Sequence, residues 1–184
     1  MSGVFSHFVR VLVVGAIVLL SACTSYSGRT LEAGVSTLPE VVATMGEPSM
    51  RWKDDDGREQ LAYPRGPYGT QTFMAFMGVD GRLERIEGVL DDKHFARIEN
   101  GKSDMAAVLR LIGPPTPQWT AYFKARDELA MEWRFCDAWN QVARLDVLFD
   151  ATTGIVRSTF QRPELPEMSF SFGRQRHGAS FCGH

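Results

Sequence analysis

The sequence predicts an α+β fold made of two tandem repeats, each with short helices followed by a small antiparallel β-meander. The first observation is a pair of similar stretches 67 residues apart, GVSTLPEVVATMGEP at residues 34–48 and GKSDMAAVLRLIGPP at residues 101–115. The second is that each stretch has apolar residues at helical spacing and then Gly and Pro, which together stop a helix. The third is that strand-like segments follow both stretches. Fixed spacing of this kind is typical of a duplicated unit.

The helix expected in the first repeat begins after Ser36 and stops at Gly46. Its apolar residues recur every three or four positions and are Leu38, Val41, Val42 and Met45. Because a helix that ends at Gly commonly places that residue in the left-handed conformation, we expect a left-handed C-cap here.

The helix expected in the second repeat has Ser103 or Asp104 as its N-cap and stops at Gly113. Its apolar residues are Met105, Val108, Leu109 and Ile112. The expectation of a left-handed C-cap applies to Gly113 as well.

Three strand-like segments follow each helix. In the first repeat they are REQLAYP, TQTFMAFMG and LERIEGV, at residues 58–64, 70–78 and 83–89. In the second repeat they are RDELAMEW, VARLDVLFD and IVRSTFQ, at residues 126–133, 142–150 and 155–161. The turn sequences VDGR and ATTG favour antiparallel hairpins. Aligning Leu61 with Leu129 and Gly81 with Gly154 gives offsets of 68 and 73 residues, as expected where loops differ in length between repeats.

The N-terminus has the pattern of a signal peptide. An apolar run, VLVVGAIVLL at residues 11–20, follows Arg10, and this arrangement is typical of the h-region of a secretory signal. A retained membrane anchor is the alternative, but a membrane span needs about 20 apolar residues, and small polar residues follow this run. The next residues complete the stretch LLSAC, which resembles a bacterial lipobox at Leu20, Ser21, Ala22 and Cys23.

The lipobox resemblance implies that residues 1–22 are removed and that Cys23 receives a diacylglycerol. Several acyl chains on one residue give stable membrane anchoring, because each buried CH₂ contributes about 0.8 kcal/mol. Thr24 stands where a signal for inner-membrane retention typically has Asp, which favours the outer membrane. The alternative is an ordinary secreted protein in which Cys23 is a plain thiol.

These features predict five segments along the chain. They are a lipoprotein signal peptide at 1–22, a linker after the lipidated Cys at 23–33, a first repeat at 34–90, a second repeat at 91–161 and an irregular tail at 162–184. The tail, RPELPEMSFSFGRQRHGASFCGH, is expected to be irregular because it is rich in Pro, Gly and Ser.

The composition is that of an ordinary globular domain, with 44% hydrophobic and 23% charged residues and a formal net charge of −2. This balance offers no basic surface for nucleic acid. If Cys23 is acylated, Cys136 and Cys182 remain as a candidate disulfide in the oxidising periplasm. The sequence leaves open whether their Cα atoms come within the required distance of about 4.4–6.8 Å.

A family resemblance rests on the residues that start and stop the two helices. Five residues recur at one offset, followed in each copy by a Trp and a meander: Gly34, Ser36, Val41, Gly46 and Pro48, and then Gly101, Ser103, Val108, Gly113 and Pro115. In a lipid-anchored chain this pattern resembles the SmpA/OmlA family, also called BamE, and the tandem arrangement resembles the β-lactamase inhibitor protein fold. The resemblance implies short helices on a three-stranded antiparallel sheet and a role in the β-barrel assembly machinery. A typical BamE has one such unit and no such tail.

No residue constellation for catalysis or cofactor binding is found. The sequence has no paired-His metal motif, no G-x-S-x-G elbow and no Gly-rich phosphate loop. In the tail, His177, Cys182 and His184 include zinc-type ligand atoms, but a structural site needs a fourth ligand on a fixed scaffold. We therefore expect a non-enzymatic protein without a metal or cofactor.

Aromatic residues are dense in the second repeat and provide the candidate binding residues. Trp119, Trp133 and Trp139 could form a partner-binding surface, but core packing is favoured because small domains depend on large side chains for their buried area. Phe73, Phe76 and Phe149 lie in strand segments and are expected in the core. The expected function is an outer-membrane-anchored periplasmic interaction module that assists β-barrel assembly or envelope integrity. The alternative is an inhibitor-like or ligand-binding lipoprotein on the same fold.

Overall fold

The computed structural model describes residues 27–66, 69–164 and 182. The predicted signal peptide and the lipidation site at Cys23 lie outside the described residues, as does most of the predicted tail. Within the described residues, no helix is long and apolar enough to cross a membrane.

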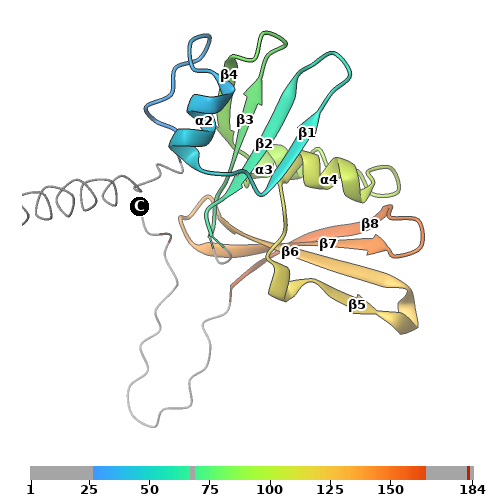
Figure 1. Ribbon diagram of the computed structural model, residues 1–184. Helices are drawn as coiled ribbons and strands as arrows, with labels where there is room; N and C mark the ends of the chain where they lie inside the picture. The colour runs from blue at the N-terminus through green and yellow to red at the C-terminus, as the bar shows by residue number, and fades with distance from the viewer. Residues whose placement is uncertain (1–26, 67–68, 165–181, 183–184) are drawn as a thin grey trace, which may run out of the picture.

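The α+β class is confirmed, because the described chain holds two four-stranded antiparallel sheets and a few short helices (Figure 1). The first half, residues 27–89, contains α2 (Leu38–Met45), β1 (Met50–Lys53), β2 (Glu59–Pro64), β3 (Thr72–Met77) and β4 (Leu83–Gly88). The second half, residues 90–164, contains α3 (Asp92–Phe95), α4 (Met105–Ile112), η1 (Pro117–Trp119), β5 (Ala121–Phe123), η2 (Lys124–Arg126), β6 (Glu128–Cys136), β7 (Val142–Asp150) and β8 (Val156–Pro163). The strand orders are β1-β2-β3-β4 and β5-β6-β7-β8.

Each sheet has one strand more than the three-stranded sheet that the family resemblance implies. The additional strands are β1 and β5, which pair with β2 and β6 at the edges of the two sheets. They are four and three residues long, and such short segments carry too little alternation to be recognised in the sequence.

The N-caps of both main helices lie one residue after Ser36 and Ser103, and local hydrogen bonds stabilise them. The N-cap of α2 is Thr37, whose amide and hydroxyl donate to the Glu40 carboxylate at 2.7 and 2.9 Å. These bonds lower the pKa of Glu40 from its ordinary value. The N-cap of α4 is Asp104, whose carboxylate accepts from the backbone amide three residues later at 2.7 Å.

The turn before each helix is bonded to the last strand of the same sheet. In the first half, the Gly34 amide donates to the Leu83 carbonyl at 2.7 Å, and the Leu83 amide donates to the Ser36 carbonyl at 2.8 Å. The second half has the same two bonds, from Gly101 to Val156 at 2.7 Å and from Val156 to Ser103 at 2.9 Å. Each helix therefore starts at a defined position over its sheet.

Both helices stop at a glycine, as expected, but the conformation differs from the expected left-handed cap. Gly46 has φ 87° and ψ −172°, and Gly113 has φ 81° and ψ −171°. The positive φ is shared with the left-handed helix, whereas the extended ψ belongs to a region that is essentially restricted to glycine. The expectation of a left-handed C-cap was therefore wrong, and the requirement for glycine at these two positions is stronger than expected.

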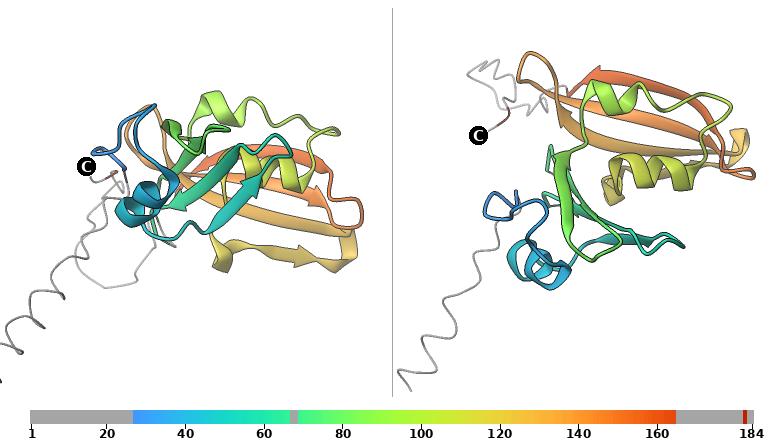
Figure 2. Two further views of the ribbon diagram at one scale, coloured as in Figure 1. Left: turned by 45° about the horizontal axis from the view of Figure 1, so that its top comes forward. Right: turned by 90° about the horizontal axis from the view of Figure 1, so that it is seen from above.

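The two helices and two sheets form successive layers. Helix α2 packs on one face of the first sheet, where Val41 and Met45 join a buried cluster with Leu61 and Tyr63. Helix α4 lies between the two sheets (Figure 2). Its Val108 and Ile112 belong to the core of the second sheet.

The predicted core phenylalanines differ in burial. Phe149 is fully buried in the core of the second half. Phe73 and Phe76 are partly buried and pack against two separate clusters of the first half. They lie on opposite faces of β3 because their positions differ by an odd number of residues.

Strand pairing gives a different alignment of the two halves from the expected one. Met77 of β3, at the register shift opposite β4, pairs with Glu59 of β2. Phe149 of β7, at the equivalent shift opposite β8, pairs with Leu129 of β6. Glu59 is thus equivalent to Leu129, so the expected alignment of Leu61 with Leu129 was wrong by two residues. Because side chains alternate between faces, a two-residue slip leaves the buried and exposed positions unchanged.

The described residues also shift two predicted boundaries. Within the predicted linker at 23–33, Leu31 packs against the core of the first half and the Glu32 amide donates to the Ser36 hydroxyl at 3.0 Å. At the other end, β8 continues to Pro163, beyond the predicted start of the tail at residue 162. The expected junction between residues 34–90 and 91–161 falls between β4 and α3.

Replacing Gly113 by Ala is expected to lower the free energy of unfolding by about 1–3 kcal/mol, because its backbone conformation is nearly restricted to glycine. The added Cβ would also lie 2.7 Å from Cγ2 of Thr72 in the first half. Gly101→Ala is the matched control, since its φ is 75° but its Cβ would meet nothing within 4 Å. Urea denaturation measures both variants, and an equal loss in the two would contradict the steric contribution.

Candidate interaction surface

The second sheet packs one face against α4, and within the described residues no α-helix covers its other face (Figure 2). Strand alternation places Trp133 and Leu145 on the α4 side, where both are 1% exposed. The residues next to them in sequence point to the other side, which we call the open face. It carries Trp119 and six charged residues: Glu132, Arg134, Arg144, Asp146, Arg162 and Glu164.

The charged residues of the open face form a continuous chain of ion pairs with alternating sign. At one end, Glu164 accepts from Arg134 Nη2 at 2.5 Å and from Arg144 Nη2 at 2.7 Å. Burial raises the pKa of Glu164, but the bonds from Arg144 and Arg134 outweigh burial, and the net shift is downward. These contacts attach the end of β8 to β6 and β7.

Glu132 continues the chain toward its other end. It accepts from Arg144 Nη1 at 2.7 Å and also from Arg162, whose Nε donates to Asp146 at 2.7 Å. Glu132 is only 5% exposed. Burial and then a hydrogen bond with Asp146 raise its pKa, while the guanidinium groups of Arg144 and Arg162 oppose that shift.

Trp119 belongs to the open face, where it is partly buried. The Arg144 guanidinium lies 4.0 Å from the centre of its ring, and that of Arg134 lies 5.9 Å away. A cation over an indole face is attracted by the ring quadrupole. The ring therefore supports the middle of the ion-pair chain and is not a free aromatic anchor.

The three candidate tryptophans are not brought together. Trp133 is a core residue, 1% exposed, and its Nε1 donates to the Gly113 carbonyl at 3.1 Å. Trp139 is 81% exposed, in the turn between β6 and β7. The expectation of one surface containing Trp119, Trp133 and Trp139 is therefore not met, because Trp133 supports the fold.

The turn that carries Trp139 is braced from two directions. The Asp137 carboxylate accepts from the amides of Trp139 and Gln141 at 2.9 and 2.8 Å. At the base of the turn, Cys136 forms a disulfide with Cys182, with a Cα–Cα distance of 6.1 Å. The Cys182 amide also donates to the Asn140 carbonyl at 3.1 Å. The pairing that the sequence left open is thus present, and it holds an exposed indole in a defined place.

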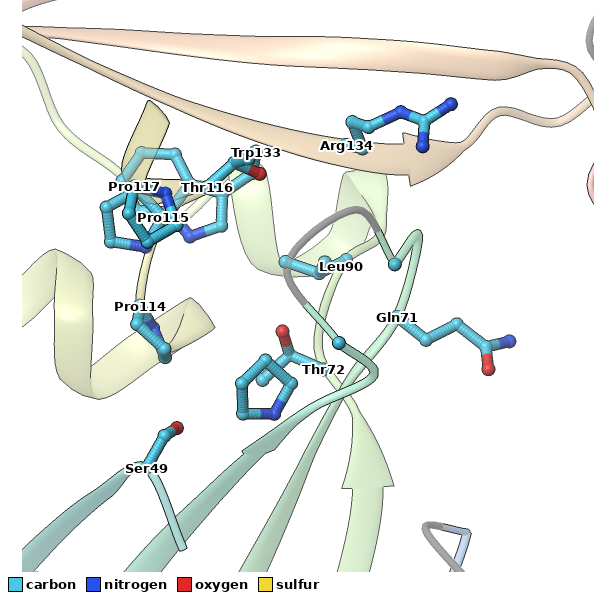
Figure 3. Close-up of a pocket in the computed structure, with 13 residues that line it drawn as sticks. Ser49, Gln71, Thr72, Leu90, Pro114, Pro115, Thr116, Pro117, Trp133 and Arg134 are labelled. Carbon is cyan, nitrogen blue, oxygen red and sulfur yellow. The ribbon is translucent and has the colours of Figure 1, made fainter. Parts of the chain in front are cut away.

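A hollow of about 320 Å³ lies where the two halves meet. Figure 3 shows three prolines and Trp133 on one side of it, and Leu90 and Thr72 on the other. The prolines are Pro114, Pro115 and Pro117, which lead from α4 to β5. A pocket of this size with mainly apolar walls is typical of a small-ligand site.

The described residues contain no group of three or more His, Cys, Asp or Glu side chains that could hold a metal ion. His177 and His184, the other members of the candidate tail cluster, lie outside the described residues. Cys182 is in a disulfide and therefore offers no thiolate.

Sequence reasoning missed most residues of the open face. Alternation along 126–133 and 142–150 could have placed Glu132 and Asp146 opposite the core. Their ion-pair partners could not be inferred, because Arg162 was assigned to the irregular tail. Residues at 162–164 become part of the surface only because β8 pairs with β7 as far as Pro163.

Glu164→Gln is expected to lower the free energy of unfolding by about 1–3 kcal/mol at pH 7, because two charge-assisted hydrogen bonds lose their ionised acceptor. The pKa of Glu164 is lowered in the folded state, so its contribution is present above the carboxyl's unfolded pKa and lost as pH falls through the folded pKa. Urea denaturation at pH 7 and pH 3 should therefore give a smaller difference from wild type at the lower pH.

The control for this variant is Glu99→Gln, which removes an exposed pair with Lys102 and should cost less than about 1 kcal/mol. A wild-type minus Glu164→Gln difference that does not change with pH would contradict an electrostatic origin. A loss no larger than that of Glu99→Gln would contradict the role of the ion-pair chain in attaching β8.

Comparisons with known proteins do not identify this chain. No protein-family model matches the sequence. No curated protein and no solved structure matches it either. The family resemblance therefore rests only on the residues that start and stop the two helices and on the order of helices and strands in each half.

Proposed function

We propose that this chain is a lipid-anchored periplasmic protein of the outer membrane, a non-enzymatic interaction module that assists β-barrel assembly or envelope integrity. The observation that carries the proposal is Trp139, 81% exposed on a turn braced by a disulfide. Large aromatic side chains dominate the binding energy of many protein interfaces. A rigidly held indole also loses little conformational freedom when a partner binds.

The proposal includes two BamE-like units in tandem. Paired hydrogen bonds support this part, because Gly34 and Gly101 each donate to the last strand of their own sheet at 2.7 Å. Gly46 and Gly113 end the two helices with φ and ψ values that agree within 6°. Both sheets also run in the same meander order. The fourth strand in each sheet departs from the family pattern.

The proposed location rests on the N-terminal sequence and on the disulfide. The LLSAC stretch resembles a lipobox. A disulfide between Cys136 and Cys182 is typical of a protein in an oxidising compartment such as the periplasm. Together they favour a protein anchored through Cys23 with its folded part in the periplasm.

The alternative is a ligand-binding or inhibitor-like lipoprotein, and the apolar hollow between the two halves favours its ligand-binding form. Its volume of about 320 Å³ and its proline-rich wall suit a small apolar ligand. Purification from detergent-solubilised outer membrane separates the two functions. Recovery of barrel-assembly subunits supports the interaction module. Recovery of a periplasmic enzyme or a small apolar molecule without those subunits supports the alternative.

Cys23→Ser is expected to abolish palmitate labelling and to remove the protein from the outer-membrane fraction, because the acyl acceptor is lost. Metabolic labelling with palmitate followed by membrane fractionation measures both effects. Cys182→Ser is the control and should keep its label. Labelling of the Cys23→Ser variant at the wild-type level would refute the anchor.

Trp139→Ala is expected to weaken capture of the barrel-assembly partner by about 1–4 kcal/mol without a loss of thermal stability, because the side chain is exposed. Trp133→Ala should instead cost about 3–5 kcal/mol of stability through the cavity that it leaves. Val79→Ala, 64% exposed in the β3–β4 turn, is the surface control. Capture by Trp139→Ala at the wild-type level would overturn this binding site.

A further inference from the structure

A second pocket, of about 290 Å³, lies between the first sheet and helices α3 and α4. Its position is separate from the open face and from the turn that carries Trp139. Among its lining residues are three arginines and one histidine: Arg85, Arg97, Arg110 and His94. Arg85 lies in β4 and Arg110 in α4, while His94 lies in α3 and Arg97 just after it. Cationic groups from both halves of the chain therefore converge on one pocket.

One wall of the pocket consists of side chains that bond to one another. Gln60 of β2 donates to the Arg110 carbonyl at 2.5 Å and accepts from Arg110 Nε at 3.2 Å. Arg110 Nη2 contacts both oxygens of Asp54 at 2.7 Å. This wall is therefore rigid and nearly neutral, so the attraction of the pocket for a ligand has to come from other groups.

Two guanidinium groups at the pocket have unused donors. The Arg97 side chain makes no ion pair or hydrogen bond with the described residues, whereas its backbone amide donates to the His94 carbonyl at 3.0 Å. Arg85 lies 3.7 Å from the centre of the Phe76 ring and has two long ion-pair contacts, from Nε to Glu87 at 3.5 Å and from Nη1 to Glu84 at 3.7 Å, which leave Nη2 unpaired among the described residues. Planar guanidinium groups with unpaired N–H donors bind oxyanions with several oxygens particularly well.

His94 supplies a third group, and it is only 3% exposed. Its Nδ1 lies 2.6 Å from the Asp91 carboxylate. Burial raises the pKa of Asp91, but its hydrogen bonds with His94 outweigh burial, so the acid is ionised at neutral pH. An ionised carboxylate only accepts, so Nδ1 carries the proton, and Nε2 has no hydrogen-bond partner among the described residues.

We propose that this pocket binds a small phosphate monoester through Arg97, Arg85 and His94. The guanidinium groups donate to the unprotonated oxygens. His94 Nε2, the ring nitrogen that Asp91 leaves unbonded, hydrogen-bonds the O–H of a monoprotonated phosphate. An ionised carboxylate has no O–H to offer Nε2, and the remaining volume beside the Phe76 ring accommodates the organic part of the ligand. This inference goes beyond the proposed function and does not depend on the lipid anchor.

The test is calorimetric titration of the full-length chain in detergent with inorganic phosphate, glycerol 3-phosphate and sulfate at pH 6.5 and constant ionic strength. We expect saturable binding of both phosphate compounds and binding of sulfate at least threefold weaker, because sulfate carries no O–H at this pH. Glycerol 3-phosphate should bind more tightly than inorganic phosphate if the organic part occupies the pocket. Equal affinities would assign the site to free phosphate.

Arg97→Gln should weaken binding of the phosphate compounds at least tenfold, and thermal denaturation checks that it stays folded. Arg58→Gln is the matched control, because that arginine lies in the exposed β1–β2 turn and should leave binding unchanged. NMR signals of the His94 ring should move on titration in the wild type. Absence of saturable binding, or wild-type affinity in Arg97→Gln, would overturn the site. Equal affinity for sulfate and phosphate would overturn the role of His94.

Discussion

Helix α4 contacts both sheets at once, and the rest of the architecture depends on this placement. Val108 and Ile112 are 1% and 0% exposed in the core of the second sheet. On another side of the same helix, Arg110 forms its two-oxygen ion pair with Asp54 of the first half. Gln60 of the first half also bonds to Arg110. These polar contacts orient the two halves, because few other arrangements satisfy both donors and acceptors.

The placement of α4 gives equivalent faces of the two sheets different environments. By the strand register, Ala62 and Met74 of the first sheet correspond to Glu132 and Asp146 of the second. The first pair faces the second half and is 0% exposed, whereas the second pair lies on the open face among arginines. An unpaired charge beneath a helix would lose its hydration without compensation. The alternating ion-pair chain therefore lies on the sheet face that no described α-helix covers.

The candidate binding residues were partly predictable from sequence, and their arrangement was not. Tryptophan is dense in the second half, but Trp133 and Trp139 separate because one is within a strand and the other is in a turn. The disulfide was foreseen only as an option, since 46 residues separate the two cysteines. The pocket proposed to bind phosphate had no sequence signal, because its arginines and its histidine come from residues 85, 94, 97 and 110 on different elements.

The sequence by itself determined the α+β class, the two main helices, their glycine stops and the longer strands. These features depend on neighbouring residues, through helical periodicity, capping side chains and turn preferences. Only the tertiary structure decided which strand positions of the two halves correspond, where the short edge strands lie, where α4 packs and which sheet face is the open face. Those features depend on contacts between distant residues, such as Arg110 with Asp54 and Glu164 with Arg134. Such contacts leave no periodic pattern in the chain, because each is a single pairing made possible by the packing of everything else.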